Sequence, residues 1–264
     1  MSVLELRQVC KYFGGLAALE KLDLSVEEGE LVGLIGPNGA GKTTVFNLIT
    51  GLYRPTSGEI KFYGRNLIGL APHQITALGI ARTFQNIRLF SEMTVLNNVK
   101  IGMHWHSRYG VATSILRLPT WSRKEKEIAE KSEELLSIFG LISKKDELAK
   151  NLPYGQQRRL EIARALACRP KLLLLDEPAA GMNPQETQEL VKLIRWLRDE
   201  FNLTILLIEH DMSLVMGVCQ RIYVLDYGRR IAVGTPEEVR TDPRVIQAYL
   251  GEEEENGQWP HAAN

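Results

Sequence analysis

The clearest pattern along the chain is a series of short apolar runs, which occupy residues 31–35, 172–175, 203–208 and 222–225. A strand that is buried on both faces has this composition, whereas a strand with one exposed face alternates apolar and polar residues. Segments with helical spacing separate the last three runs. The pattern therefore predicts a parallel sheet that is covered by helices on both faces.

Two segments near the beginning of the chain, 3–9 and 22–26, alternate apolar and polar residues, and 59–63 follows a Thr-Ser-Gly turn. Such alternation is typical of half-buried strands. We therefore expect additional strands with one exposed face before residue 64.

Between about residues 85 and 160 the strand signal fades and helical spacing replaces it. Apolar and small side chains recur on one predicted helix face at Ile128, Ser132, Leu135, Leu136 and Phe139. Arg123/Glu127 and Lys126/Glu130 are i,i+4 pairs that indicate a solvated face of the same helix. The pattern predicts a helical insertion at 85–160 between two core segments, 1–84 and 161–251.

Composition limits the class of protein. A chain of 264 residues with 44% apolar residues can form one large domain or a core with an inserted subdomain. Its 32 basic and 32 acidic residues cancel, so no overall positive charge favours nucleic acid, and we expect no nucleic-acid partner. The three cysteines have no metal-binding spacing, which fits a reducing compartment. No apolar run approaches the ~18 residues of a membrane span. The first residues also lack a signal-peptide pattern, so any membrane role is expected to come through a partner.

The segment 36–43, Gly-Pro-Asn-Gly-Ala-Gly-Lys-Thr, matches the phosphate-binding loop pattern G-x-x-x-x-G-K-[ST]. Its glycines allow backbone N–H groups to surround phosphate oxygens, Lys42 can reach the β- and γ-phosphates, and the Thr43 hydroxyl can ligate Mg²⁺. An apolar strand precedes the loop, and the following segment reads as a helix whose N-terminus favours anions. The predicted ATP-binding residues are Gly36, Pro37, Asn38, Gly39, Ala40, Gly41, Lys42, Thr43 and Thr44.

A pair of carboxylates follows the apolar run 172–175. Asp176 at the strand tip is placed to bind Mg²⁺, and Glu177 can orient and deprotonate an attacking water. An acidic turn after a strand is common, but after a phosphate-binding loop it is typical of a Walker B element. We therefore predict Glu177, together with Lys42, as catalytic.

Three further elements accompany these two. Gln85 lies where the strand signal gives way to helices, and residues 151–159 (Asn-Leu-Pro-Tyr-Gly-Gln-Gln-Arg-Arg) open a helix. His210 stands at the end of the strand that the run 203–208 predicts. In this order the five elements closely resemble those of ATP-binding-cassette (ABC) ATPases, and the resemblance covers nearly the whole chain.

The resemblance implies an α/β fold: a P-loop NTPase core with a mainly parallel sheet, an antiparallel β subdomain and an inserted helical subdomain. It implies a single ABC ATPase domain at 1–251. The remaining residues, 252–264, contain a four-glutamate run with Gly257 and Pro260, and this composition predicts a flexible tail. Two such cassettes would enclose two ATP molecules, each bound to Mg²⁺ through Thr43, Gln85 and Asp176. His210 would hold the γ-phosphate as a third catalytic residue. Phe13, with Tyr12 as the neighbouring choice, would stack on adenine. The signature loop would face the ATP of the opposite protomer with Leu152, Pro153, Tyr154, Gly155 and Gln156.

Finer features are similar to one branch of this family, the importers of branched-chain amino acids (leucine, isoleucine and valine). They lie at 79–85, 103–130, 152–157, 176–184 and 248–251, and together they resemble the longer of the two ATPases that such importers usually carry. The implied partners are transmembrane permease subunits and a second ABC ATPase subunit or a second copy of this chain. A periplasmic or extracellular solute-binding protein would act indirectly. The implied location is peripheral, on the cytoplasmic face of the inner or plasma membrane.

The chain departs from the general family pattern at three positions. Pro153 and Tyr154 replace the Ser and first Gly of the signature Leu-Ser-Gly-Gly-Gln, and Asn183 stands where an aspartate is usual. Arg158 and Arg159, which follow the signature, are expected to be exposed on its helix.

Two alternatives stay open. The motor does not reveal the direction of transport, so transport of another amino acid, of urea or of lipid, including export, is one of them. A soluble cassette ATPase without a transport role is the other. Such proteins usually carry two cassettes, a long coiled coil or a basic arm, and this chain has a single phosphate-binding loop, no sustained heptads and no net charge.

Overall fold

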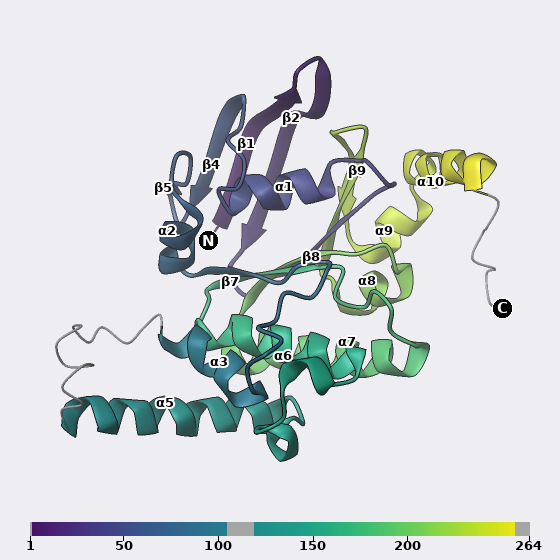
Figure 1. Cartoon of the computed structure of the whole chain (residues 1–264). Helices are drawn as coiled ribbons and strands as arrows, with labels where there is room; N and C mark the ends of the chain where they lie inside the picture. Colours follow the sequence, from purple (N-terminus) through teal and green to yellow (C-terminus); the bar gives the residue numbers. More distant parts are fainter. Residues whose placement is uncertain (1, 105–118, 257–264) are drawn as a thin grey trace. The chain divides into compact units, whose positions relative to one another are not determined.

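The computed structural model describes residues 2–104 and 119–256 and divides into two compact units (Figure 1). Unit 1 combines Met1–Ile75 with Gln188–Asn264, and unit 2 is Thr76–Thr187. The predicted helical segment 85–160 falls inside unit 2.

Unit 1 contains an antiparallel sheet with the strand order β2-β1-β4-β5. Its strands are β1 (Ser2–Phe13), β2 (Leu16–Glu27), β4 (Ser57–Phe62) and β5 (Arg65–Asn66). The apolar residues of the alternating patterns, such as Leu4, Val9 and Leu24, are buried. The strands expected at the beginning of the chain are therefore confirmed, and β1 and β2 extend beyond the predicted ends.

The second group of strands in unit 1 is mainly parallel. It comprises β3 (Leu31–Ile35), β8 (Thr204–Ile208), β9 (Arg221–Asp226) and β10 (Arg229–Gly234). Strand β3 lies between β8 and β9 and is parallel to both, while β10 is antiparallel to β9. Every residue of β3 and β8 is buried, as their continuous apolar runs predict. Because Leu34 lies opposite Ile208 in the register, the carboxyl ends of β3 and β8 meet at one edge.

Several of the helices begin at a residue whose side chain caps the first turn. Unit 1 holds α1 (Lys42–Ile49), α8 (Met212–Val218), α9 (Pro236–Thr241) and α10 (Pro243–Asn256). Two further helices, α2 (Pro72–Leu78) and α7 (Pro184–Phe201), cross from one unit into the other along the chain. At the start of α7 the Asn183 side chain accepts the N–H of Glu186 at 2.9 Å and the Glu186 carboxylate accepts the N–H of Asn183 at 3.0 Å, which forms a capping box.

Helix α10 continues through 252–256, the first part of the predicted tail, while 257–264 lie outside the described residues, so the flexibility of the tail stays a prediction. Within 2–104 and 119–256, no helix has the length and apolar character that crossing a membrane requires.

Unit 2 places a pair of parallel strands beside a group of helices. The strands are β6 (Ile80–Arg82) and β7 (Leu172–Asp176), with Arg82 opposite Leu174. The helices are α3 (Val95–His104), α5 (Pro119–Ile138) and α6 (Tyr154–Ala167), joined by the 3₁₀ turns η1 (Ile142–Lys144) and η2 (Ala149–Asn151). Helices α3, α5 and α6 pack against one another (Figure 1). The predicted stripe is buried at all five positions, of which four lie on α5 and Phe139 follows its last residue. The α/β class, with parallel strands, an antiparallel sheet and a helical segment, is confirmed.

Candidate active site

The phosphate-binding loop connects β3 to α1, and two of its glycines have no room for a side chain. A Cβ on Gly36 would lie 2.0 Å from the carbonyl oxygen of Leu225, and a Cβ on Gly41 would lie 2.6 Å from that of Ala18. Both glycines also have a positive φ, 145° and 100°, which disfavours L side chains. Glycine is therefore required at both positions for the loop to close against its neighbours.

Lys42 is buried at the start of α1, and its ammonium group faces its own loop. The Nζ atom donates to the carbonyl oxygens of Gly36 at 2.5 Å and Pro37 at 2.8 Å. No side chain caps the first turn of α1, because Gly41 occupies the N-cap position. The N–H groups of a helix first turn and a nearby ammonium are the donors that a phosphate requires.

His210 follows β8 directly, so it lies at the sheet edge where β3 leads into the phosphate-binding loop. Its N–H donates to the carboxylate of Glu209 at 3.1 Å, and Glu209 is buried. The His210 side chain is exposed. The local register thus places His210 and the phosphate-binding loop at the same edge of unit 1.

Phe13 lies at the end of β1, with 42% of its surface exposed. It contacts Tyr53 edge to face, with 5.2 Å between ring centroids, and the Lys11 ammonium lies 4.7 Å from its ring centre. Tyr12 is equally exposed. An exposed aromatic with a neighbouring cation can accept a flat, electron-rich ring, which is compatible with the predicted adenine contact.

In unit 2, Asp176 is the last residue of β7 and is buried. Its Oδ2 accepts a hydrogen bond from Arg82 Nη2 at 2.7 Å, and both side chains are almost fully buried. The Asp176 N–H donates to the Thr83 hydroxyl at 3.3 Å. The carboxylate has a second oxygen, Oδ1, which is of the type that ligates a metal ion. The sequence pattern did not single out Arg82 as a site residue, although it stands in the same short segment as Gln85.

Glu177 follows Asp176 and contacts Gln85. The Gln85 Nε2 donates to Glu177 Oε2 at 2.6 Å, so the amide oxygen of Gln85 is the atom that can face a cation. Glu177 has φ 47°, in the left-handed region that few residues other than glycine adopt. Such backbone strain clusters at functional sites, where the surrounding structure enforces it.

The signature segment opens α6, with Pro153 as its N-cap residue. The N–H groups of Gln156 and Gln157 both donate to the Pro153 carbonyl at 3.0 Å. A Cβ on Gly181 would lie 3.1 Å from the Tyr154 ring, so this tyrosine covers the loop that follows Walker B. The first turn of α6 therefore engages the Gln156 N–H internally, and an anion in front of the helix would meet Tyr154 and Gly155.

Arg158 is not exposed, so this expectation was wrong. It is fully buried, and its Nη1 donates to the carbonyl oxygen of Phe84 at 2.6 Å and to Glu161 at 2.9 Å. Its Nη2 donates to the carbonyl oxygen of Gln85 at 2.7 Å. The guanidinium thus connects the signature helix with the backbone of the Gln85 segment. Only the planar fork of an arginine can reach both carbonyls and the carboxylate at once.

The predicted residues fall into two local groups. Unit 1 contains the phosphate-binding loop, His210 and Phe13, while unit 2 contains Gln85, Asp176, Glu177 and the signature segment. Within the described part of the chain, no group of three or more His, Cys, Asp or Glu residues could hold a metal on its own. The predicted Mg²⁺ ligands are hard oxygen donors, and few of them are carboxylates. Mg²⁺ bound together with a nucleotide phosphate uses such a set.

Comparison with known proteins agrees with the site. Residues 19–180 match the family model of the ABC transporter. The sequence is 52% identical over 240 residues to the high-affinity branched-chain amino acid transport ATP-binding protein LivG of Salmonella typhimurium, covering 91% of this chain and 94% of that protein. It is 48% identical over 250 residues to the corresponding protein BraF of Pseudomonas aeruginosa, covering 95% and 98%.

Among solved structures, the chain is similar to the ADP conformation of MJ1267, an ATP-binding cassette of an ABC transporter. The TM-score is 0.83 at 34% identity, with coverage of 95% of this chain and 99% of that one. The chain therefore belongs to the ABC transporter family. Within that family, residues 229–255 match the model described as the branched-chain amino acid ATP-binding cassette transporter.

Proposed function

We propose that this protein is the ATP-binding and ATP-hydrolysing subunit of an importer of branched-chain amino acids. The observation that carries this proposal is the 52% identity to a branched-chain amino acid transport ATP-binding protein over nearly the full length of both chains. The intact phosphate-binding loop and the acidic pair after β7 support ATP hydrolysis as its chemistry.

The site residues divide the hydrolysis reaction among themselves. Lys42 and the first-turn N–H groups of α1 neutralise the charge on the phosphates, and Glu177 accepts the proton of the attacking water. His210 holds the γ-phosphate in the geometry of the transition state. Phosphoryl transfer needs mainly positioning and electrostatic stabilisation, which these groups supply. Phe13 stacks on the adenine.

A Mg²⁺ ion would be held by Thr43, Gln85 and Asp176 together with phosphate oxygens. The donor set fits, because each of these side chains has an oxygen that can serve as a ligand and no softer donor belongs to it. When bound, the ion supplies charge neutralisation on the phosphates.

The signature segment would act on the ATP that a second cassette holds. Pro153 lacks both an N–H and a hydroxyl, and the Gln156 N–H is engaged by the Pro153 carbonyl. Two N–H groups, those of Tyr154 and Gly155, are left to face an anion, so this half-site is weak. A partner cassette with a different signature, rather than a second copy of this chain, completes the stronger half-site.

Transport requires a membrane partner, and unit 2 has a hollow that can receive one. It encloses about 670 Å³, and its wall includes the exposed residues Phe90 and Ile101. The guanidinium of Arg164 lies 5.4 Å from the Phe90 ring centre, and Arg88 also lines the hollow. This lining combines apolar side chains with the cations Arg88 and Arg164, and it suits a short permease segment that carries an apolar and an acidic side chain. This contact would keep the protein peripheral, on the cytoplasmic face of the membrane.

Nucleotide binding and turnover of two variants test the proposed motor. Glu177→Gln should bind ATP normally and lose most turnover, because the carboxamide can still orient water but cannot accept its proton. Lys42→Ala should instead weaken ATP binding itself. If Glu177→Gln hydrolysed ATP nearly as fast as the unmodified protein, the catalytic base would be another residue. Omission of Mg²⁺ from the same assay measures the metal requirement.

A further inference from the structure

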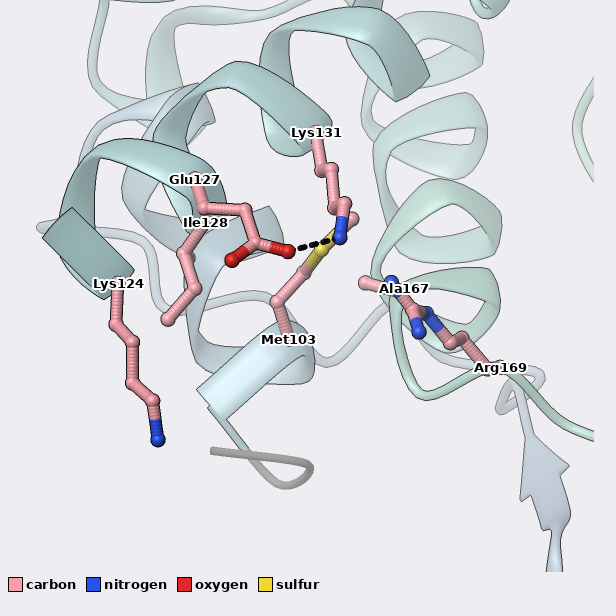
Figure 2. Close-up of a pocket in the computed structure, with 7 residues that line it drawn as sticks. All are labelled: Met103, Lys124, Glu127, Ile128, Lys131, Ala167 and Arg169. Atoms are coloured by element: carbon pink, nitrogen blue, oxygen red, sulfur yellow. Dashed lines mark hydrogen bonds and ion pairs between the residues drawn. The ribbon is translucent and has the colours of Figure 1, made fainter. Parts of the chain in front are cut away.

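A second, smaller pocket lies on the helical side of unit 2 and is not part of the nucleotide site. It encloses about 170 Å³ between the end of α3, the first half of α5 and the end of α6. Figure 2 shows its seven lining residues. They are Met103, Lys124, Glu127, Ile128, Lys131, Ala167 and Arg169.

The polar part of the lining has both signs of charge, with an excess of positive charge. Three cations, Lys124, Lys131 and Arg169, accompany one carboxylate, Glu127. Lys131 bonds to Oε1 of Glu127, as the dashed line in Figure 2 marks. An ammonium group has three donors and a carboxylate has two oxygens. The pair can therefore bind a further anion through Lys131 and a further cation through Oε2 of Glu127.

The charges of the pocket act on one another. The pKa of Glu127 is lowered, chiefly by its hydrogen bond to Lys131 and by the charge of Lys131; desolvation opposes these two effects, and the charges of Arg169 and Arg123 make smaller lowering contributions. Glu127 is thus ionised at neutral pH, and the positive charge of Arg169 reaches the same carboxylate. The i,i+4 partner expected for Glu127 was Arg123, whereas the structure pairs Glu127 with Lys131 at the pocket.

The remaining lining is apolar. Met103 and Ala167 are buried, and so is Ile128, and all three contribute side-chain carbon or sulfur to the pocket wall. A cavity of about 150 Å³ with an apolar lining is large enough for benzene. The pocket is therefore of the right size for a molecule with a short aliphatic chain and a small polar head.

Arg169 has an unusual backbone for an arginine. It follows the end of α6 with φ 46°, in the left-handed conformation that usually belongs to glycine at this position of a helix end. A glycine would avoid the cost of a side chain in this conformation. The Arg169 side chain points back toward Ala167 and the pocket (Figure 2).

We propose that this pocket binds a small aliphatic amino acid as a regulatory ligand. The carboxylate of the ligand meets Lys131 and Arg169, its ammonium group meets Oε2 of Glu127, and its side chain packs on the apolar wall (Figure 2). The choice of leucine, isoleucine and valine as ligands rests on the proposed function. The broader assignment of an aliphatic amino acid rests only on the charges, size and apolar wall of the pocket.

The position of the pocket indicates how such a ligand would act. Arg169 and Ala167 lie at the end of α6, and the same helix begins at Tyr154 and holds the backbone of Gln85 through Arg158. A ligand that stabilises one position of α6 would change the equilibrium of the signature segment, provided that it binds one state of the protein better than another. The protein would then respond to the internal concentration of the solute that it helps to import.

Calorimetric titration of the purified full chain with leucine tests the binding step. Three related probes separate the contacts: 4-methyl-2-oxopentanoate has the same chain without an ammonium group, glycine lacks the chain, and inorganic phosphate is an anion without either. We expect saturable binding of leucine and at least roughly tenfold weaker binding of each of the other probes, because each loses a charge-assisted bond or the apolar contact. Equal or tighter binding of the oxo acid or of phosphate would overturn the proposal in favour of a general anion site.

Three variants locate the ligand. Arg169→Gly removes a cation while it relaxes the backbone, so misfolding cannot explain a loss of leucine binding. Glu127→Gln should weaken leucine binding while the affinity for the oxo acid stays the same or rises, because only leucine needs the carboxylate. Glu130→Gln, on the same helix with Lys126 as its partner and outside the pocket lining, is the matched control and should bind leucine normally. Unchanged leucine affinity in Arg169→Gly and Glu127→Gln, or no leucine binding by the unmodified chain, would refute the site.

The regulatory step has its own readout. Saturating leucine should change the ATPase rate of the unmodified protein at least twofold and leave that of Arg169→Gly unchanged. Leucine binding without any change in the ATPase rate would refute regulation. None of these measurements depends on transport, so a failure here is distinguishable from a failure of the proposed import function.

Discussion

The buried guanidinium of Arg158 offers the sharpest test of how unit 2 is held together. Arg158 bonds to the carbonyl oxygens of Phe84 and Gln85 and to the carboxylate of Glu161, which is itself buried. The second oxygen of Glu161 accepts the N–H of Arg88 at 3.1 Å. Arg158→Met would keep an unbranched side chain of moderate volume and remove every donor of the guanidinium. The Glu161 charge would then remain buried without its cation.

The expected loss follows from these contacts. Removing one partner of a buried ion pair typically costs about 3–5 kcal/mol, because the remaining charge is desolvated without compensation. The double variant Arg158→Met/Glu161→Gln no longer buries an isolated charge, and its amide oxygen can still accept the Arg88 N–H. We therefore expect the double variant to be more stable than Arg158→Met by at least ~1 kcal/mol, as coupled neighbours show. The stability of Arg158→Lys should lie between those of Arg158→Met and the double variant, since one ammonium group cannot replace the planar fork of the guanidinium.

Equilibrium unfolding in denaturant measures these differences. Arg7→Met is the matched control, because Arg7 forms an ion pair with Glu5 at 2.7 Å on the surface, where 62% of its side chain is exposed. Such pairs contribute about 0–1 kcal/mol. A second readout, the ATPase rate, should fall in Arg158→Lys even where the protein remains folded, because the Gln85 backbone loses its donor. If Arg158→Met were no less stable than Arg7→Met, the buried network would not stabilise unit 2.

Three further outcomes are expected. Sedimentation of the Glu177→Gln form with ATP should show a monomer or a weak dimer. Adding Pro153→Ser and Tyr154→Gly should strengthen the dimer, because these changes restore hydrogen-bond donors. A tight dimer before these changes would contradict the weak half-site. Burial raises the pKa of the Cys219 thiol from its ordinary value of 9.0 to about 12, so between these pH values the thiol stays protonated in the folded state and ionises on unfolding. Stability should therefore fall as the pH rises from 9.0 to about 12, and equilibrium unfolding of Cys219→Ala over this range should show a smaller loss; an equal loss would assign the alkaline sensitivity elsewhere. Phe90→Asp should reduce co-purification with the permease subunits while ATP binding by the isolated chain is unchanged, and undiminished co-purification would move the docking site away from the hollow.

Elements with a strong local signal could be predicted from the sequence. Strands β3, β7 and β8 are buried on both faces, and their continuous apolar runs reveal this directly. The capping box at Asn183 and the buried stripe of α5 depend on near neighbours in the chain, so they were also predictable.

Elements that depend on distant partners were not predicted. Strand β6 has only three residues and exists because it pairs with β7, some 90 positions later. Strand β10 pairs with its neighbour β9 but begins with two arginines, so its apolar run has only three residues, 231–233. Arg158 was misassigned because an arginine on a helix is usually exposed, and its burial depends on the carbonyl groups of Phe84 and Gln85, 74 and 73 positions away. Likewise, nothing in the local sequence distinguishes Asp176 bound to Arg82 from an unpaired carboxylate.

Uptake of radiolabelled leucine, isoleucine and valine measures whether this protein drives the proposed transport. The cells should lack the chromosomal copy and carry a plasmid with either the unmodified protein or Glu177→Gln, produced at equal levels. We expect high-affinity uptake of these amino acids to disappear with the deletion, to return with the unmodified protein and to remain absent with Glu177→Gln. Unchanged uptake of all three after the deletion, or full rescue by Glu177→Gln, would contradict the proposal that ATP hydrolysis by this protein energises branched-chain amino acid import.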